Sequence, residues 1–162
     1  MRNRSFSFLF FLAFILISCD ANGVFDTYQS VSNTWHKDAQ VHFNIKEIDT
    51  SKTYNLFVNL RNNNKFKYSN IHLIVTLDYP NGKTIKDTLE YKMTKPNGAF
   101  LGTGFSSIKE NKLWYKENFR FNEYGEYQLH IQHAMRKNGE VNGIIELEGI
   151  TDVGFRIENT NK

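Results

Sequence analysis

Two histidines, His130 and His133, have the H-x-x-H spacing that lets two imidazoles share a metal ion on a helix. The residues around them alternate between polar and apolar types, which predicts a strand instead. Because residues three apart on a strand point to opposite faces, we do not expect joint ligation. The other histidines have no acidic or cysteine neighbour at ligand spacing: His36, His42 and His72. We therefore predict no metal site.

Motifs for catalysis or cofactor binding are absent as well. The glycine-rich segment 98–104 (GAFLGTG) lacks the lysine of a phosphate-binding loop, and no strand-to-helix transition surrounds it. Ser106 follows it without the second glycine of a nucleophile elbow. Glu146, Glu148 and Asp152 could in principle form a carboxylate pair for glycoside cleavage, but they are expected to be solvated groups flanking strand starts. The sequence therefore predicts a protein that is not an enzyme and holds no cofactor.

Four aromatic residues offer an alternative binding chemistry. Trp35, Trp114, Tyr115 and Tyr124 could stack against sugar rings, as aromatic side chains do in carbohydrate-binding modules. Tyrosine and tryptophan are also ordinary core and interface residues. Glycan or peptidoglycan binding is therefore kept as the alternative function.

The residue with the clearest chemical role is Cys19, the only cysteine of the chain. Two arginines and an apolar run from 6 to 17 precede it, which is typical of a signal peptide. As a helix that run would span about 18 Å, less than the roughly 30 Å of a bilayer core. The motif Leu16-Ile17-Ser18-Cys19 resembles the lipobox of bacterial lipoproteins. We expect residues 1–18 to be cleaved and Cys19 to be acylated, with two or more acyl chains giving a stable membrane anchor.

Removal of the signal peptide changes the charge balance. Without Arg2 and Arg4, 18 basic residues (20 minus 2) remain against 17 acidic ones, so the mature chain is nearly neutral. No basic tract is left to suggest nucleic acid as a partner. The remaining residues suit one domain of ordinary size. We expect a lipidated tether over 19–38, which docks partly onto the domain, and a folded domain over 39–162.

The folded part shows a period of two almost everywhere. Apolar residues alternate with mostly polar ones over 71–79, the turn Pro80-Asn81-Gly82 follows, and 85–91 continues the pattern. This predicts a β-hairpin whose second strand has Asp87 on its apolar face. Similar alternation is found in five further segments, namely 41–45, 54–60, 113–121, 127–131 and 151–157.

These patterns predict an all-β protein, an antiparallel β-sandwich of the jelly-roll or immunoglobulin-like kind with about seven to eight strands. Three connections are long: 61–70, 92–112 and 134–149. Long loops on a sandwich are where contacts with partners usually lie.

Eight segments, several of them long and in this order along the chain, resemble the gliding-motility lipoprotein family GldH. They include 24–26 (VFD), 35–38 (WHKD), 54–64 (YNLFVNLRNNN), 68–71 (YSNI), 79–82 (YPNG), 101–105 (LGTGF), 109–115 (KENKLWY) and 147–157 (LEGITDVGFRI). The resemblance covers nearly the whole chain and includes the lipidated cysteine, which corresponds to Cys19. It implies a non-enzymatic accessory of the gliding machinery and of the type IX secretion coupled to it.

The expected partners are the membrane, through the acyl chains on Cys19, and other envelope proteins of gliding or type IX secretion. Asp20 directly follows the cysteine. An aspartate at this position retains lipoproteins in the inner membrane in some sorting systems, but that rule need not apply here. We expect the outer membrane, with the domain facing the periplasm.

Overall fold

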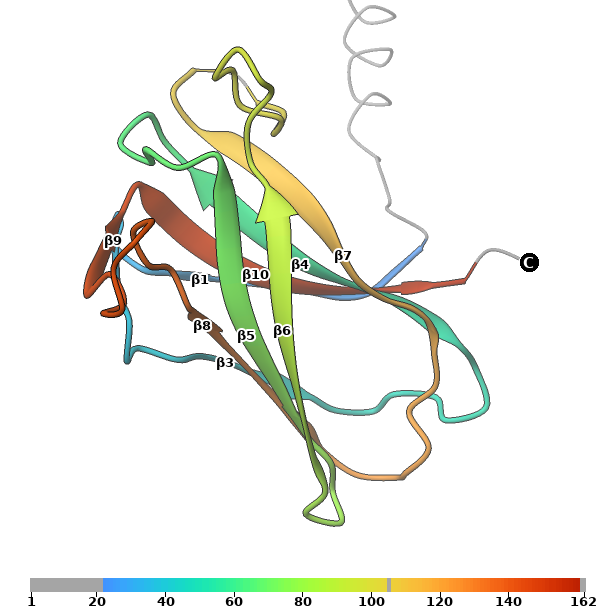
Figure 1. The fold of residues 1–162 in the computed structure, drawn as a ribbon. Helices are drawn as coiled ribbons and strands as arrows, with labels where there is room; N and C mark the ends of the chain where they lie inside the picture. The colour runs from blue at the N-terminus through green and yellow to red at the C-terminus, as the bar shows by residue number, and fades with distance from the viewer. Residues whose placement is uncertain (1–21, 105, 161–162) are drawn as a thin grey trace, which may run out of the picture.

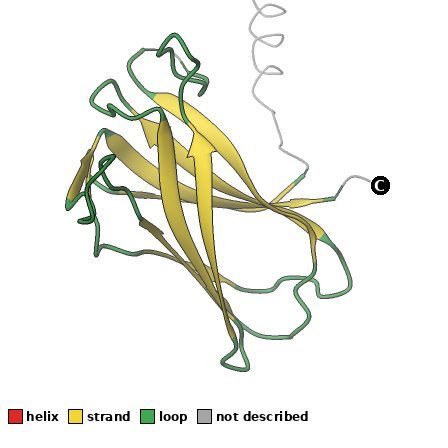
Figure 2. Cartoon of the chain, viewed as in Figure 1, coloured by secondary structure: helices red, strands yellow, loops and turns green. Residues whose placement is uncertain are grey.

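The computed structural model describes residues 22–104 and 106–160, and this part of the chain contains ten strands and no helix (Figure 2). The predicted all-β antiparallel sandwich is thus confirmed. No helix among these residues is long and apolar enough to cross a membrane. The predicted signal peptide 1–18 and the predicted lipidation site Cys19 lie outside the described residues.

Two four-stranded antiparallel sheets form the sandwich (Figure 1). Sheet I has the order β1 (Gly23–Ser30), β10 (Ile150–Asn159), β4 (Tyr54–Asn62), β7 (Lys109–Phe119). Sheet II has the order β3 (Val41–Ile45), β8 (Tyr127–His133), β5 (Asn70–Asp78), β6 (Thr84–Lys92). A short two-stranded ribbon joins β2 (Thr34–His36) to β9 (Glu146–Glu148).

The strand order distinguishes between the two predicted kinds of sandwich. Along the chain the long strands alternate between the sheets, except for the hairpin of β5 and β6 within sheet II. This connectivity is that of a jelly roll and differs from the immunoglobulin arrangement. The eight long strands agree with the predicted number, and the two remaining ones are three-residue strands too short to show a period.

Strand β1 lies within the range 19–38, the predicted tether. It pairs antiparallel with β10 from Gly23 opposite Glu158 to Ser30 opposite Asp152. Strand β2, in the same range, places Trp35 in the core with 1% of its surface exposed. Much of this segment is therefore built into the sandwich.

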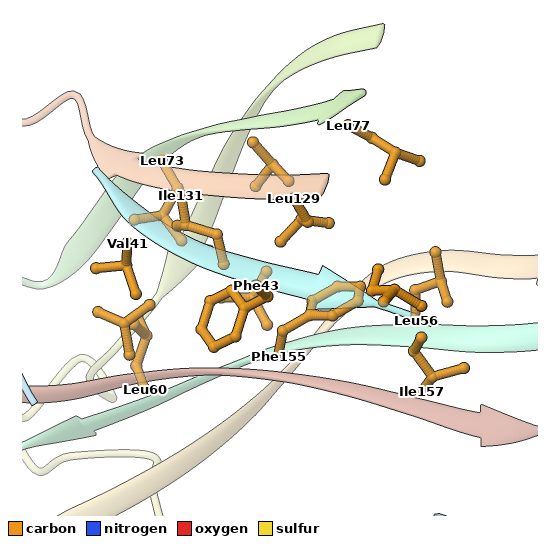
Figure 3. Close-up of a cluster of buried hydrophobic side chains, with 14 of the residues drawn as sticks. Val41, Phe43, Leu56, Leu60, Leu73, Leu77, Leu129, Ile131, Phe155 and Ile157 are labelled. Carbon is orange, nitrogen blue, oxygen red and sulfur yellow. The ribbon is translucent and has the colours of Figure 1, made fainter. Parts of the chain in front are cut away.

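The core lies between the two sheets, because alternate residues of each strand point inward. Figure 3 shows part of it, with residues of sheet I facing residues of sheet II. The fully buried apolar side chains include Leu56, Leu60, Leu73, Leu77, Leu129, Ile131, Phe155 and Ile157. Burial of each such side chain contributes about 1.5–3 kcal/mol to folding.

The hairpin of β5 and β6 is confirmed in the predicted position. The Tyr79 amide donates to the Lys83 carbonyl at 2.8 Å, and the Gly82 amide donates to the Tyr79 carbonyl at 2.9 Å. Gly82 has a φ of 87°, a conformation that glycine adopts without strain.

The seam where β6 meets β7 explains why an acid interrupts the apolar face of β6. The Asp87 carboxylate accepts a hydrogen bond from the Tyr115 hydroxyl at 2.7 Å and pairs with Lys116 Nζ at 2.8 Å, both on the other sheet. Nearby, the Tyr91 hydroxyl donates to the Trp114 carbonyl at 2.6 Å. Burial raises the pKa of Tyr91 to about 12, so its hydroxyl stays a donor at neutral pH. The edges of the two sheets are thus joined by polar side chains.

Candidate interaction surface

The two histidines of the H-x-x-H motif point to opposite faces of β8, as predicted. His133 is buried in the sandwich, where its Nε2 donates to the Trp35 carbonyl at 2.9 Å. Burial lowers the pKa of His133 and outweighs the opposing effect of that hydrogen bond. His130, on the outer face, contacts Asp78 at 2.8 Å.

One contact on the outer face of sheet II is not evident from the sequence. His42 Nδ1 lies 2.5 Å from His130 Nδ1, and the chain of contacts continues from His130 to Asp78. The three residues come from β3, β8 and β5, so only the pairing of these strands brings them together. Among the described residues no group of three or more His, Cys, Asp or Glu side chains is arranged to hold a metal ion.

The candidate carboxylates each have a separate ionic or hydrogen-bonding partner. Glu146 lies 3.9 Å from His36, and Glu148 pairs with Lys67 at 3.4 Å. Asp152 accepts a hydrogen bond from the Thr151 hydroxyl at 2.7 Å. These contacts are those of surface carboxylates at strand starts.

The four aromatic candidates fall into two groups. Trp35 is in the core, and the Tyr115 hydroxyl points into the seam at Asp87. Trp114 and Tyr124 are exposed, with 55% and 88% of their surface accessible. Trp114 lies in the middle of β7, whereas Tyr124 is in the loop before β8. The structure therefore does not unite the four rings in one platform.

Trp114 belongs to an ordered cluster on the outer face of sheet I, which we call the aromatic face (Phe57, Trp114, Lys112, Arg156, Glu158 and Asp26). Phe57 is opposite Trp114 in the pairing of β4 with β7, and their ring centroids are 4.4 Å apart. Lys112 Nζ lies 4.1 Å from the centroid of the Phe57 ring. Although it faces away from the core, Phe57 is only 3% exposed.

A chain of charges surrounds these rings. Lys112 Nζ pairs with Glu158 at 2.7 Å, Glu158 pairs with Arg156 Nε at 2.6 Å, and Arg156 also pairs with Asp26. Burial opposes ionisation of Glu158, but the hydrogen bonds from Lys112 and Arg156 outweigh it and hold its pKa below the usual range. The charges of the face therefore position one another.

The same sheet face continues over β1, where Tyr28 lies across Gly154. A Cβ atom at Gly154 would lie 2.7 Å from the Tyr28 ring, so glycine is what allows this close approach. The Arg61 guanidinium lies 4.0 Å from the ring centroid, and both Tyr28 and Arg61 donate to Glu110, at 3.0 and 2.9 Å. Burial and the Glu110 carboxylate raise the pKa of Tyr28, so it remains a neutral phenol.

Between these two groups lies Asn59, which is 3% exposed although it also points outward. Its side-chain oxygen finds no hydrogen-bond donor among the described residues. A buried acceptor left without a donor costs about 1–3 kcal/mol. The outer face of sheet I thus has an environment more like an interior than like a solvated sheet surface.

This face suits recognition of a partner better than catalysis. Tryptophan, tyrosine and arginine are the residues that contribute most to binding energy at protein interfaces. Sequence alone suggests Phe57 only weakly, as the one large apolar residue on the otherwise polar side of 54–60. The cross-strand pairing with Trp114 requires the register of β4 against β7.

The sandwich has two ends of different character (Figure 1). At one end lie both ends of the described chain, where the Asn159 amide donates to the Asn22 carbonyl at 3.0 Å, together with the loops 46–53, 79–83 and 120–126. At the opposite end lie the longer connections 63–69, 93–104 with 106–108, and 134–145. The Met93 amide donates to the Ser69 carbonyl at 2.7 Å, which ties two of these loops together. We call these the terminal end and the loop end.

Comparison with known proteins identifies the family. The sequence profile of the GldH lipoprotein family matches residues 23–157. The gliding motility lipoprotein GldH of Flavobacterium johnsoniae is 50% identical over 158 residues, which are 98% of each chain. A gliding motility lipoprotein GldH homolog of Christiangramia forsetii is 56% identical over 162 residues, 99% of each chain.

Among solved structures, the VP2 subviral particle of infectious bursal disease virus aligns with a TM-score of 0.38 and 13% identity. The alignment covers 86% of this chain and 34% of the viral chain. The profile match and the two full-length relatives place this chain in the GldH family of gliding-motility lipoproteins.

Proposed function

We propose that this lipoprotein is anchored through Cys19 and acts as a non-enzymatic accessory of the gliding machinery and of type IX secretion by binding other envelope proteins. Family membership supports the role in motility. The aromatic face on sheet I is the proposed contact surface, and the exposed Trp114 over the buried Phe57 is the observation that carries this assignment.

Trp114 has the properties of an interface anchor. It is more than half exposed on a regular strand and packs on Phe57, so its orientation is set before a partner arrives. Neighbouring charges are already paired, which lowers the cost of desolvating them at an interface.

The anchor determines which end of the domain faces the membrane. Strand β1 begins at Gly23, four residues after Cys19, so Gly23 lies within about 14 Å of the lipidated residue. The terminal end is therefore close to the membrane. The loop end is farther out by up to the length of β10, about 33 Å for ten residues. We place the domain on the periplasmic side of the outer membrane.

The test replaces the chromosomal gene by variants in a gliding bacterium and measures colony spreading and secretion. Trp114→Ala should weaken partner binding by about 2 kcal/mol, the size typical of an anchor residue, or roughly thirtyfold. Tyr124→Ala is the matched control, because Tyr124 is also an aromatic residue and is more exposed than Trp114, but lies on a loop outside the aromatic face. A photo-crosslinking residue at position 114 should capture an envelope protein.

The proposal would be contradicted if Trp114→Ala left spreading and secretion normal and the crosslinking residue at position 114 captured no protein. Retention of the protein on an insoluble glycan that is lost in Trp114→Ala would favour the alternative function, a carbohydrate- or peptidoglycan-binding lipoprotein. Of the four aromatic candidates for glycan stacking, two are engaged inside the sandwich or its seam.

A further inference from the structure

A second surface, at the loop end, has a different chemistry. Two adjoining hollows of about 440 and 590 Å³ share Ser69 and Asn70 as lining residues. Together they form what we call the basic groove. Five cationic side chains line it: Lys67, Lys92, Lys95, Arg136 and Lys137.

The groove is much more positive than the mature chain as a whole. Two acidic residues, Glu90 and Glu140, also line it, so five positive and two negative charges leave a local balance of +3. The chain without its signal peptide carries 18 basic and 17 acidic residues. The fold has therefore concentrated positive charge in this groove.

Three of the groove cations are free to bind another molecule. Lys67 pairs with Glu148 at 3.4 Å, and Lys137 lies 3.8 Å from Glu140. The other three cations are Lys92, Lys95 and Arg136, and all three are exposed. Within residues 22–104 and 106–160, their side chains form no ion pair or hydrogen bond.

The floor of the groove is held in place by hydrogen bonds. The Asn70 side chain donates to Glu90 at 2.7 Å across the β5–β6 pair, and the His72 amide donates to the sulfur of Met135 at 3.2 Å. Met135 and Met93 are both buried beneath the loops. A preformed groove loses little conformational entropy on binding, which favours affinity.

We propose that the basic groove binds an acidic segment of a partner protein. Carboxylates are the groups that unpaired lysine and arginine side chains recognise. The loop end is opposite the end at which the chain is tethered, so anionic headgroups of the anchoring membrane are remote from it. An anionic glycan is less favoured because the ring that lines the groove, Tyr68, is half-buried and packs edge-on against Phe66 at 5.6 Å.

This inference rests on the proposed function in taking the partner to be a protein and in taking the chain to be anchored through Cys19. The two surfaces have no residue in common, so variants can separate them. Loss of function in Trp114→Ala concerns the aromatic face, and the groove is tested by its own variants.

The experiment uses the full acylated protein in detergent and a fluorescein-labelled deca-glutamate peptide, with binding followed by fluorescence anisotropy at low salt. The triple variant Lys92→Ala, Lys95→Ala, Arg136→Ala should bind the peptide roughly tenfold more weakly, as expected when three solvent-screened ion pairs are removed. Added salt should weaken binding by the wild-type protein more than binding by this variant.

The matched control is the triple variant Lys83→Ala, Lys86→Ala, Arg120→Ala, which loses the same net charge on exposed residues outside the groove. It should bind like the wild-type protein, and both variants should keep the wild-type unfolding temperature. Failure of the wild-type protein to bind the peptide, or equal losses in the two triple variants, would overturn the proposal. Binding of polygalacturonate through the groove without binding of the peptide would replace it by a glycan site.

Discussion

Asp87 offers the sharpest test of how the two sheets are held together. The alternating pattern of β6 suggests that a leucine at this position would extend the apolar face and stabilise the sandwich. The structure predicts the opposite, because the carboxylate accepts from the Tyr115 hydroxyl at 2.7 Å and pairs with Lys116 at 2.8 Å. Asp87→Leu removes both contacts and leaves a hydroxyl and an ammonium in the seam without partners.

The magnitude follows from the burial of the pair. The side chains of Asp87 and Lys116 are 31% and 25% exposed, so solvent screens their attraction only partly. Hydrogen bonds to charged groups contribute about 1.5–3 kcal/mol, and the added apolar surface of leucine offsets part of the loss. We expect Asp87→Leu to lower the free energy of unfolding by about 2 kcal/mol, or the unfolding temperature by roughly 4–8 °C.

The assay is urea unfolding of Asp87→Leu, of Tyr115→Phe and of the double variant. If the hydroxyl and the carboxylate interact as described, the double variant should lose about 1 kcal/mol less than the sum of the single variants. A wild-type stability in Asp87→Leu would refute the reasoning, and so would full additivity in the cycle.

The pH dependence gives a second readout of the same contact. Burial opposes ionisation of Asp87, but the hydrogen bonds from Lys116 and Tyr115 outweigh it and hold its pKa below the ordinary value of 3.8. The stabilisation is therefore present above that value and is lost as the pH falls through the lower folded-state pKa. Asp87→Leu should lack this part of the acid sensitivity.

Two further predictions concern other positions. Burial lowers the pKa of His133, so as the pH falls the unfolded chain binds a proton before the folded one does. The free energy of unfolding should therefore fall as the pH drops below about 6.5. In His133→Gln the unfolding temperature should depend less steeply on pH, and an unchanged pH dependence would contradict this prediction. Gly149→Ala should cost more than about 3 kcal/mol, because φ is +88° and the new Cβ would lie 2.0 Å from the Phe66 amide nitrogen. Gly139→Ala, with φ +80° and no atom within 4 Å, is its control and should cost only about 1 kcal/mol; equal losses in the two variants would disprove the steric argument.

Features that depend on neighbours in the chain could be predicted from the sequence. The hairpin of β5 and β6 follows from an alternation of residue types and from the turn Pro80-Asn81-Gly82, and it forms at the predicted place. The apolar residues expected to face inward along β5 and just after it, from Ile71 to Tyr79, are all buried. The prediction of acylation at Cys19 is likewise local, since it rests on the residues just before the cysteine.

The candidate surfaces could not be predicted in this way. In the sequence, Asp87 interrupts an apolar face without an evident reason. Its partners, Tyr115 and Lys116, lie on β7 and are brought to it only by the packing of the two sheets. Phe57 and Trp114 are far apart in the chain, and only the register of β4 against β7 puts one ring on the other. Nothing in the chain order suggests that Lys67, Lys92 and Arg136 line one groove.

The sequence by itself determined that this protein is all-β, which residues face the core in the strands with a clear alternation, where a signal peptide should end, and which family the chain resembles. These properties follow from side-chain chemistry and from the period of two along a strand, which act over a few residues. Only the tertiary structure decided the jelly-roll order, the seam, the aromatic face and the basic groove. Each of them depends on which strands and loops become neighbours, and that choice is made by burial of the whole core rather than by any single segment.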